Sequence, residues 1–461
     1  MRAKLAALSA AFLAFAVLAA ATAHAADRPA MPVKAPAQPV PASWTQFYLG
    51  GGIGFDAERG RSSVTAGGTV GATFSTEGFQ GASLGLSATA GFDLQVSPRF
   101  VVGAFADYDR AHQDTTVAVS SFGNTASVTA LRLDGGWTIG GRAGVLLTPD
   151  VLLYGLGGFT QMRVNNWGLA TTGFSLQEPT LTLDGHTVGA GIEYRLASNV
   201  SLRGEYRYLS LARSTTVDAV NNLVWVNEIS AHMGRLMAAY RFGGPGMTTP
   251  APPVPAPLTA WNGFYGAIGV GADAISRTLH TEIPGFATFD ASGLGGADLA
   301  GTVMVGFDHQ LVAGWVAGIF GSYEFANNGN ARVAVDVTGL DISTDMASID
   351  QSWTVGGRAG YLIAPDALLY GLAGYTKTTF HQVTYDLLVV AGTAVLPDFH
   401  GITLGGGFEK LITDNVSMRA EYRNTRLETQ SGYPAPGLVN TQSQPTINAV
   451  RFLVAYRVPT K

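Results

Sequence analysis

The chain contains two copies of one sequence, and this duplication restricts its fold more than any other feature. Trp137–Gln161 and Trp353–Lys377 share 17 of 25 residues at an offset of 216. At the same offset, Asn199–Arg207 aligns with Asn415–Arg423. Self-similarity over this length predicts two domains of the same fold rather than one domain of 461 residues.

Proline-rich segments precede both copies. The first copy spans residues 44–242 and follows residues 26–43, which contain five prolines. The second copy spans residues 261–461 and follows residues 243–260, which contain six. Because proline-rich composition favours extended chain, we interpret these segments as a leader and a linker between two folded bodies.

The first 25 residues have the three parts of a secretory signal peptide. A basic start precedes an apolar run over Leu5–Ala23, and Ala23-His24-Ala25 has the small-x-small pattern of a cleavage site. A helical membrane anchor is the alternative, but the cleavage pattern and the proline-rich segment that follows favour export. No second apolar stretch reaches the 18 residues that a spanning helix needs.

The first copy contains eight candidate strands, rich in β-branched residues, aromatic residues and glycine. We expect them near residues 44–56, 82–96, 100–110, 131–147, 151–163, 180–197, 199–212 and 229–242. Tight turns alternate with long polar connections, which is the layout of an outer-membrane barrel. The second copy repeats this order. The predicted fold class is therefore all-β, with two tandem eight-stranded antiparallel transmembrane β-barrels. The alternative is one sixteen-stranded barrel.

Alternation along the strands separates charged from apolar side chains. Arg203, Glu205 and Arg207 share one face of a strand whose other face carries Leu202 and Gly204. The same analysis of every strand assigns nine charges in each copy to one surface. They are Asp93, Asp109, Arg142, Glu193, Arg203, Glu205, Arg207, Arg235 and Arg241, then Asp308, Glu324, Arg358, Glu409, Arg419, Glu421, Arg423, Arg451 and Arg457.

These charges must face the interior if the barrels span a membrane. A basic side chain facing lipid at the bilayer midplane costs roughly 2–4 kcal/mol. About seven such costs exceed a typical net stability of about 5–15 kcal/mol. A soluble, lipocalin-like barrel would place the charges in water, but it gives no reason for both copies to keep matching charges, since exposed ion pairs contribute little.

Aromatic residues at the ends of the expected strands form a second pattern. We predict that they form interfacial girdles where the barrels meet the lipid headgroups. They are Trp44, Phe47, Tyr48, Tyr240 and Phe242, then Trp261, Phe264, Tyr265 and Tyr456.

The motifs of both copies resemble a known family. W-x-x-F-Y after a proline-rich leader, G-G-R-A-G-x-L…P-D…L-Y-G-L-x-G, N-V-S-x-R-x-E-Y-R and a closing A-Y-R are similar to the small porin-like, opacity-type outer-membrane proteins of alphaproteobacteria. The resemblance implies eight-stranded barrels with structural or immunogenic roles in the envelope, some linked to haem binding or adhesion. The chain departs from the family in its tandem form and in ending Tyr456–Lys461 without a terminal aromatic residue.

The sequence offers no pattern typical of catalysis or of a bound cofactor. It has no cysteine, which removes thiol nucleophiles and cysteine-ligated metals. No histidine falls at the same position of both copies, no histidine spacing suits a metal, and no phosphate-binding loop follows the glycine clusters. We therefore predict no enzymatic activity, no cofactor and no metal, and keep haem or ligand binding by the loops as a remote alternative.

Two functions remain. The first is a structural or surface-interaction protein of the cell outer membrane, in which the interior charges plug each barrel. The second is a passive-diffusion porin, in which one larger barrel has a charged lumen. Expected partners are outer-membrane lipid, lipopolysaccharide, the barrel assembly machinery and periplasmic chaperones. A net charge of −5 gives no reason to expect nucleic acid, and the sequence does not identify the ligands of the loops.

Overall fold

The computed structural model describes residues 43–459, apart from residues 243–260 and short gaps in the connections, of which residues 67–71 are the longest. Residues 42–461 form one compact unit. The expected signal peptide, the leader up to residue 42 and the linker lie outside the described residues. Among the residues that the structure describes, no helix is long and apolar enough to cross a membrane.

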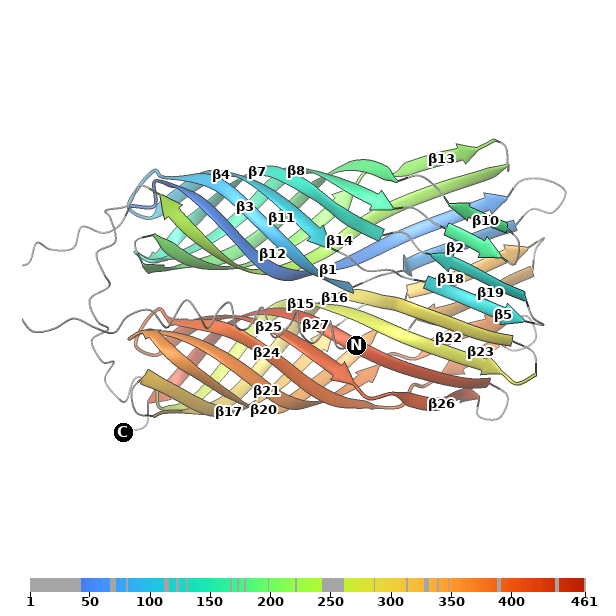
Figure 1. The fold of residues 1–461 in the computed structure, drawn as a ribbon. Helices are drawn as coiled ribbons and strands as arrows, with labels where there is room; N and C mark the ends of the chain where they lie inside the picture. The colour runs from blue at the N-terminus through green and yellow to red at the C-terminus, as the bar shows by residue number, and fades with distance from the viewer. Residues whose placement is uncertain are drawn as a thin grey trace, which may run out of the picture. The chain divides into compact units, whose positions relative to one another are not determined.

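Eight strands of the first copy form a closed antiparallel ring, which we call barrel 1 (Figure 1). They are β1 (Gln46–Ala66), β3 (Ala82–Gln95), β4 (Phe100–Ala111), β7 (Arg132–Thr148), β8 (Val151–Asn165), β11 (Leu181–Ala197), β12 (Val200–Leu211) and β14 (Leu223–Phe242). The ring closes because β14 pairs with β1, from Phe47 opposite Phe242 to Ala66 opposite Leu223.

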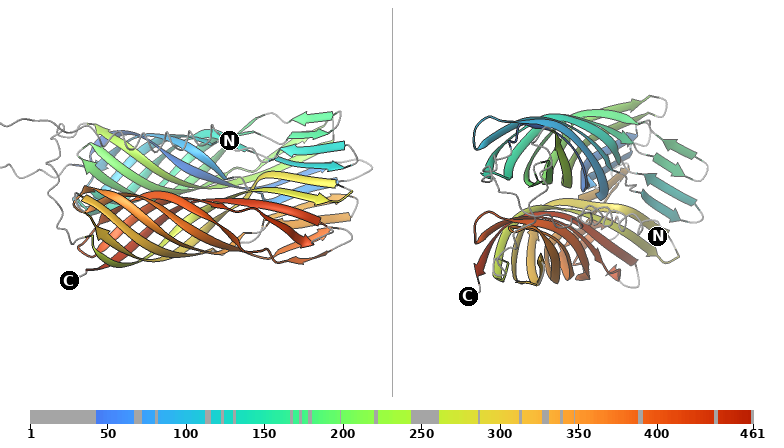
Figure 2. Two further views of the ribbon diagram at one scale, coloured as in Figure 1. Left: turned by 60° about the horizontal axis from the view of Figure 1, so that its bottom comes forward. Right: turned by 60° about the vertical axis from the view of Figure 1, so that its left-hand side comes forward.

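The second copy forms barrel 2 in the same way, with tilted strands that wrap around each ring (Figure 2). Its strands are β15 (Gly263–Ile283), β16 (Ala287–Gln310), β17 (Trp315–Ala326), β20 (Ile349–Ala364), β21 (Ala367–Phe380), β24 (Phe399–Leu411), β25 (Val416–Leu427) and β27 (Val439–Pro459). Pairing of β15 with β27 closes this ring. The prediction of two eight-stranded barrels is confirmed, and the sixteen-stranded alternative is wrong.

The two ends of each barrel differ in how the strands connect. At one end, the turn end, short turns join neighbouring strands, such as the turn at Pro149 and Asp150 between β7 and β8. At the other, the long-loop end, the strands continue past the ring, and β1 extends ten residues beyond its expected end at residue 56. The extension ends in Ser62-Ser63-Val64-Thr65-Ala66, and its β-branched valine and threonine favour extended chain.

The long connections contain further short strands. They are β2 (Ala72–Phe79), β5 (Thr116–Ser121), β6 (Asn124–Thr129), β9 (Gly168–Thr171), β10 (Phe174–Gln177), β13 (Ser214–Asp218), β18 (Ala331–Val337), β19 (Leu340–Met346), β22 (Val383–Leu387), β23 (Ala391–Ala394) and β26 (Gln430–Ala435). Two of the pairings join the copies, since β2 pairs with β18 and β5 pairs with β16. These loop strands were not expected from the sequence.

Side chains alternate between the interior and the outer face of each ring, as strand geometry requires. Large apolar side chains point outward and are exposed, including Ile139 at 58 % and its equivalent Val355 at 59 %. Charged and hydroxyl side chains point inward and are buried, as Glu193 is. A soluble barrel would have its charged side chains outside and its apolar side chains inside. The opposite arrangement seen here suits a barrel surrounded by the hydrocarbon of a membrane.

Candidate functional site

The interior of barrel 1 contains a lower layer of charges near the turn end. Two carboxylates, Asp93 and Glu193, lie between Arg142 and Arg241. Arg142 donates to Asp93 Oδ1 at 2.9 Å and to Glu193 Oε2 at 2.9 Å. Arg241 donates to Asp93 Oδ2 at 2.9 Å and to Glu193 Oε1 at 2.6 Å. Arg203 adds a third ion pair to Glu193 at 3.1 Å.

Barrel 2 contains the same lower layer with the same geometry. Arg358 donates to Asp308 Oδ1 at 2.9 Å and to Glu409 Oε2 at 2.8 Å. Arg457 reaches Asp308 and Glu409 at 2.8 and 2.9 Å, and Arg419 pairs with Glu409 at 3.0 Å. In both copies these contacts connect strands on different parts of the ring. The layer therefore holds the ring together from the inside.

An upper layer of charges lies nearer the long-loop end. In barrel 1, Arg207 pairs with Glu205 and Asp107, and Arg235 pairs with Asp109. Arg235 also lies 3.5 Å from Asp107, so the layer is a connected network rather than separate pairs.

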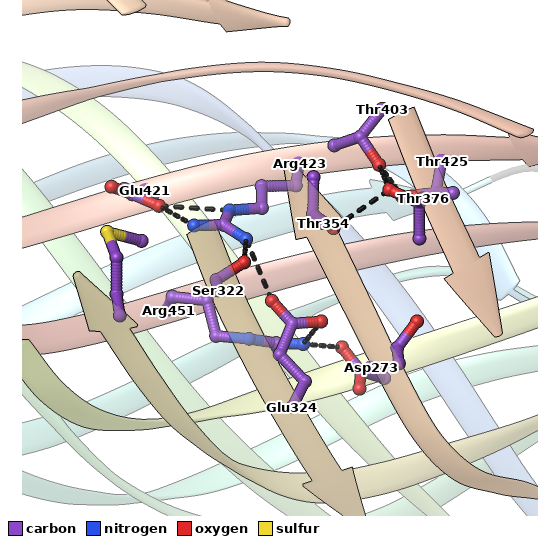
Figure 3. Close-up of polar contacts among 12 residues, drawn as sticks. Asp273, Ser322, Glu324, Thr354, Thr376, Thr403, Glu421, Arg423, Thr425 and Arg451 are labelled. Atoms are coloured by element: carbon purple, nitrogen blue, oxygen red, sulfur yellow. Dashed lines mark hydrogen bonds and ion pairs between the residues drawn. The ribbon is translucent and has the colours of Figure 1, made fainter. Parts of the chain in front are cut away.

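The upper layer of barrel 2 uses a partly different set of acids (Figure 3). Arg423 bonds Glu421 at 2.7 Å and Glu324 at 2.8 Å. Arg451 bonds Asp273 at 2.5 Å and Glu324 at 3.2 Å. Two guanidinium groups and three carboxylates thus share one network, and Glu324 bridges the two arginines.

The structure places seventeen of the eighteen predicted interior charges below 6 % exposure, and Glu324 has a side chain that is 13 % exposed. Five further charged side chains are buried that were not expected from the sequence, Asp56, Asp107, Arg195, Asp273 and Lys410. The alternation contained the signal, because Asp107 stands two residues before Asp109 and Arg195 two residues after Glu193. Asp56 and Asp273 lie beyond the expected centre of their strands.

A tryptophan lies inside the turn end of each barrel. Trp44 is fully buried, and its indole N–H donates to the Pro149 carbonyl at 3.0 Å. The Arg241 guanidinium stacks on its ring, 4.6 Å from the centroid. In barrel 2, the Trp261 indole N–H donates to the Pro365 carbonyl at 3.0 Å, and the Arg457 guanidinium stacks 4.7 Å from the centroid of its ring. Each tryptophan therefore covers the lower layer of charges from the turn end.

A tyrosine extends from the first strand of each ring into the lower layer. Tyr48 lies 4.6 Å from the Arg203 guanidinium, and Tyr265 lies 4.1 Å from that of Arg419. A glycine beside each tyrosine side chain leaves space for it. A Cβ at Gly91 would overlap the Tyr48 hydroxyl, and a Cβ at Gly306 would overlap the Tyr265 side chain.

The prediction of an interfacial girdle is therefore wrong for four of its residues. Trp44, Tyr48, Trp261 and Tyr265 are at most 3 % exposed and line the interior. The physical reason is strand geometry, since consecutive residues such as Phe47 and Tyr48 point to opposite faces. The remaining five are exposed by 44 to 65 % on the outer face. They are Phe47, Tyr240, Phe242, Phe264 and Tyr456.

A second row of outward aromatic residues, which the sequence analysis missed, lies toward the long-loop end. In barrel 1, Trp137 lies 5.6 Å from Phe159 between ring centroids. In barrel 2, the equivalent Trp353 lies 5.9 Å from Tyr375. All four are 37 to 48 % exposed. Their recurrence at one offset was visible in the sequence. Together with the first row they delimit an apolar band, as expected at two membrane interfaces.

Apolar side chains fill the interior beyond the charges. In barrel 1 they include Leu133, Met162, Val164, Leu209, Leu211, Ile229 and Met233. In barrel 2 they are Ile275, Ile349, Phe380, Phe399, Leu427 and Ile447. A ladder of threonine hydroxyls lies beside the upper layer of charges in barrel 2 (Figure 3). It runs from Thr354 to Thr376 at 2.8 Å and from Thr403 to Thr425 at 2.6 Å.

No group of three or more histidine, cysteine, aspartate or glutamate side chains suited to a metal ion occurs among the residues that the structure describes. The carboxylates of the two layers are instead bonded to arginine. This arrangement suits permanent ion pairs, because each guanidinium offers several N–H donors in fixed geometry.

Comparison with known sequences identifies the family. Residues 11–242 and 255–457 each match the outer membrane protein beta-barrel domain. The chain belongs to this family. It is an outer-membrane β-barrel protein in which the domain occurs twice. The predicted resemblance to outer-membrane proteins of alphaproteobacteria is thereby confirmed.

Two curated relatives of this outer-membrane barrel protein match about half of the chain over nearly their whole length. It is 28 % identical over 246 residues to the 31 kDa outer-membrane immunogenic protein of Brucella melitensis, covering 48 % of this chain and 95 % of the relative. The protein of the same name from Brucella suis gives the same values.

Solved structures match this chain at low similarity. The toluene transporter TodX of Pseudomonas putida is 13 % identical, with a TM-score of 0.26 and coverage of 90 % of this chain and 91 % of that one. Ail, the attachment invasion locus protein of Yersinia pestis, is 14 % identical, with a TM-score of 0.20 and coverage of 41 % and 99 %.

Proposed function

We propose that this protein is a structural and surface-interaction protein of the outer membrane whose two barrels are closed to solutes. The observation that carries the proposal is the filled interior of each ring. A buried tryptophan lies at the turn end, two layers of paired charges follow, and an apolar cluster lies toward the long-loop end. In this proposal the protein acts through contacts of its outer surfaces and loops rather than by passing solutes through a channel.

Elementary size considerations support a closed barrel. An eight-stranded ring encloses only enough room for side chains. An ion entering barrel 1 would have to displace Arg142 and Arg241 from carboxylates that they already bond. It would then meet the apolar cluster around Leu209, where it would lose its hydration without finding a polar partner.

A porin is the second candidate, and the charged interior is the observation that favours it. Porins carry polar residues toward their lumen. Here, however, the arginines are bonded to carboxylates across the ring, so the charges serve cohesion in our proposal. For the same reason we assign them no catalytic role.

The proposal includes location and orientation. Residues 1–25 act as the export signal, the turn end faces the periplasm and the long loops face the outside. The apolar band between the aromatic rows is the surface that we assign to contact with outer-membrane lipid and lipopolysaccharide. The barrel assembly machinery and periplasmic chaperones are the partners expected during insertion.

Planar-bilayer conductance of the refolded full-length protein tests the proposal. We expect no steady conductance steps above those of an empty bilayer, while heat-dependent gel mobility shows that the same sample is folded. The unfolded protein, added from urea, serves as the control for non-specific leakage. Large, long-lived steps from the folded sample alone would support the porin instead.

A further inference from the structure

One face of barrel 1 carries outward side chains that are nevertheless buried. Phe55 and Ala57 flank Asp56, which lies inside the ring, so both point away from the interior. Both are 0 % exposed. Outward residues elsewhere differ sharply, since Ile139 is 58 % exposed and Leu86 64 %. Something other than solvent or lipid therefore covers this face.

Barrel 2 supplies the cover. Phe55 and Ala57 form one apolar cluster with Ala272, Ala274 and Val450 of the second copy. A second cluster joins residues of both barrels. It contains Val151, Ile192, Tyr194 and Leu202 of barrel 1 and Ala367, Phe408 and Ala420 of barrel 2. Each of these residues is below 9 % exposure.

Both copies use the same face. Aligning the copies pairs these outward positions as Ala57 with Ala274, Val151 with Ala367, Ile192 with Phe408, Gly204 with Ala420, and Gly234 with Val450. An interface made from one patch of two homologous bodies is isologous, the type that relates the subunits of a two-fold dimer.

Equivalent residues touch one another, which places them at the local two-fold axis of such a pair. A Cβ at Gly204 would lie 2.8 Å from the Cβ of its equivalent, Ala420. A Cβ at Gly234 would lie 2.7 Å from Cγ2 of its equivalent, Val450. Small residues at such positions allow close approach, and packing of this kind drives association where lipid removes the hydrophobic effect.

The two copies differ at these positions in complementary ways. Barrel 1 places Phe55 beside Gly234 on neighbouring strands, whereas barrel 2 places Ala272 beside Val450. Two faces of copy one would bring Gly234 against Gly234 and leave a gap. Two faces of copy two would bring Val450 against Val450 in the space that a glycine now provides.

A polar contact at the turn end also joins equivalent positions of the two copies. Lys410 of barrel 2 lies 4.6 Å from the ring of its equivalent, Tyr194, and pairs with Asp150 of barrel 1 at 2.7 Å and with Asp366 at 2.5 Å. One lysine thus neutralises two equivalent aspartates. A pair of first copies would have two aspartates and no lysine, whereas a pair of second copies would have two aspartates and two lysines, so this contact disfavours the pair of first copies.

We propose that the two tandem copies form one copy-specific barrel pair within the membrane. The face around β1, β12 and β14 is the interaction surface, and its partner is the matching face around β15, β25 and β27. The duplication then does more than repeat a barrel, because the divergence of the faces selects the mixed pair over either identical pair. The pairing is independent of whether the barrels conduct.

Engineered cysteines test the contact, and the chain has none of its own. The full-length protein carries Gly204→Cys and Ala420→Cys together with a protease site in residues 243–260. After oxidation and cleavage, we expect the halves to stay joined on a non-reducing gel and to separate on reduction. Ile139→Cys with Val355→Cys is the matched control, since both positions are outward and exposed. Equal joining of the two pairs, or separation of the first, would overturn the proposal.

Size substitution tests the packing. Gly234→Leu in the protein with the cleavable linker should lower the fraction of second copy that co-purifies with a tagged first copy several-fold. Gly321→Leu is the control, because this outward glycine has open space around it. Heat-dependent mobility of each half establishes that both remain folded. Equal co-purification of the two variants would contradict the proposed interface between the barrels.

Charge reversal gives an independent readout. Lys410→Glu should reduce co-purification because it brings three acids together at the turn end. Lys377→Glu, an outward lysine of β21 that pairs with Asp398 at 2.5 Å, should not. Restoration by Asp150→Lys in the Lys410→Glu background would assign the effect to this contact. Failure of that restoration would remove Lys410 from the interface.

Discussion

The indole N–H of Trp44 donates a hydrogen bond to the carbonyl oxygen of Pro149, 105 residues later in the chain, at 3.0 Å. Trp261 and Pro365 repeat this bond at the same distance. The bond ties the start of the first strand to a turn on another part of the ring. Its recurrence explains why both copies carry the W-x-x-F-Y opening and a P-D turn.

The first prediction concerns this tryptophan. Trp44→Ala should lower the free energy of unfolding by about 3–5 kcal/mol, because it removes a large buried side chain and leaves a cavity. Phe47→Ala, three residues away but 64 % exposed, should cost less. The urea midpoint of the refolded protein measures both. Similar midpoints for the two variants would show that Trp44 does not close the turn end.

The second prediction concerns the lower layer of charges. Glu193→Gln removes a charge that three arginines share, and breaking such a buried pair costs about 3–5 kcal/mol. Glu409→Gln should behave in the same way in barrel 2. The control is Glu228→Gln, whose side chain is 44 % exposed and lies 3.5 Å from Arg213. If urea denatured Glu193→Gln and Glu228→Gln at one concentration, cohesion by the charges would be refuted.

The third prediction concerns orientation. An epitope tag at Gly285, in an open turn between β15 and β16 at the long-loop end, should be stained on intact cells. A tag at Pro98, in the turn between β3 and β4, should be stained only after permeabilisation. The reason is that outer-membrane barrels carry their long connections outside and short turns in the periplasm. The opposite staining pattern would reverse the proposed orientation.

The fourth prediction concerns closure of each ring. Since β14 pairs with β1 and β27 with β15, neither barrel needs a strand from the other to satisfy its backbone. A chain ending at Gly244, and a second chain of residues 261–461, should each refold in detergent with heat-dependent mobility. Mixing them should yield the paired species. Aggregation of both halves would show that closure depends on the intact chain.

The sequence determined the strands and their polarity, while it left two eight-stranded rings and one sixteen-stranded ring open. Charges at alternate positions of the strands leave one orientation that a bilayer tolerates, with Arg203 inside and Leu202 outside. Alternation is a local property of extended chain, so it can be read without knowing the fold. The same rule predicts that the Tyr48 side chain points inward, because it cannot share a face with Phe47.

Tertiary structure decided which charges meet. Arg142 and Glu193 stand 51 residues apart and bond across the interior, and nothing in their local sequence selects that pairing. The tilt of the strands and the closure of the ring set the height of each side chain, and both depend on all eight registers at once. Asp56 ends an expected strand that in fact continues to Ala66, and Asp273 lies well inside β15, so the heights of these two carboxylates in the rings became clear only in the structure.

Only the tertiary structure distinguished covered outward residues from exposed ones. Phe55 and Ile139 look alike in the sequence, as apolar residues at outward positions, yet one is buried and the other is 58 % exposed. Burial on the outer face depends on another body lying against it, and a periodic pattern records which side of a strand a residue occupies but not what lies beyond that side. The sequence determines that each barrel has an interior and an outer face, and the packing of Gly234 against Val450 decides which part of that outer face belongs to the partner.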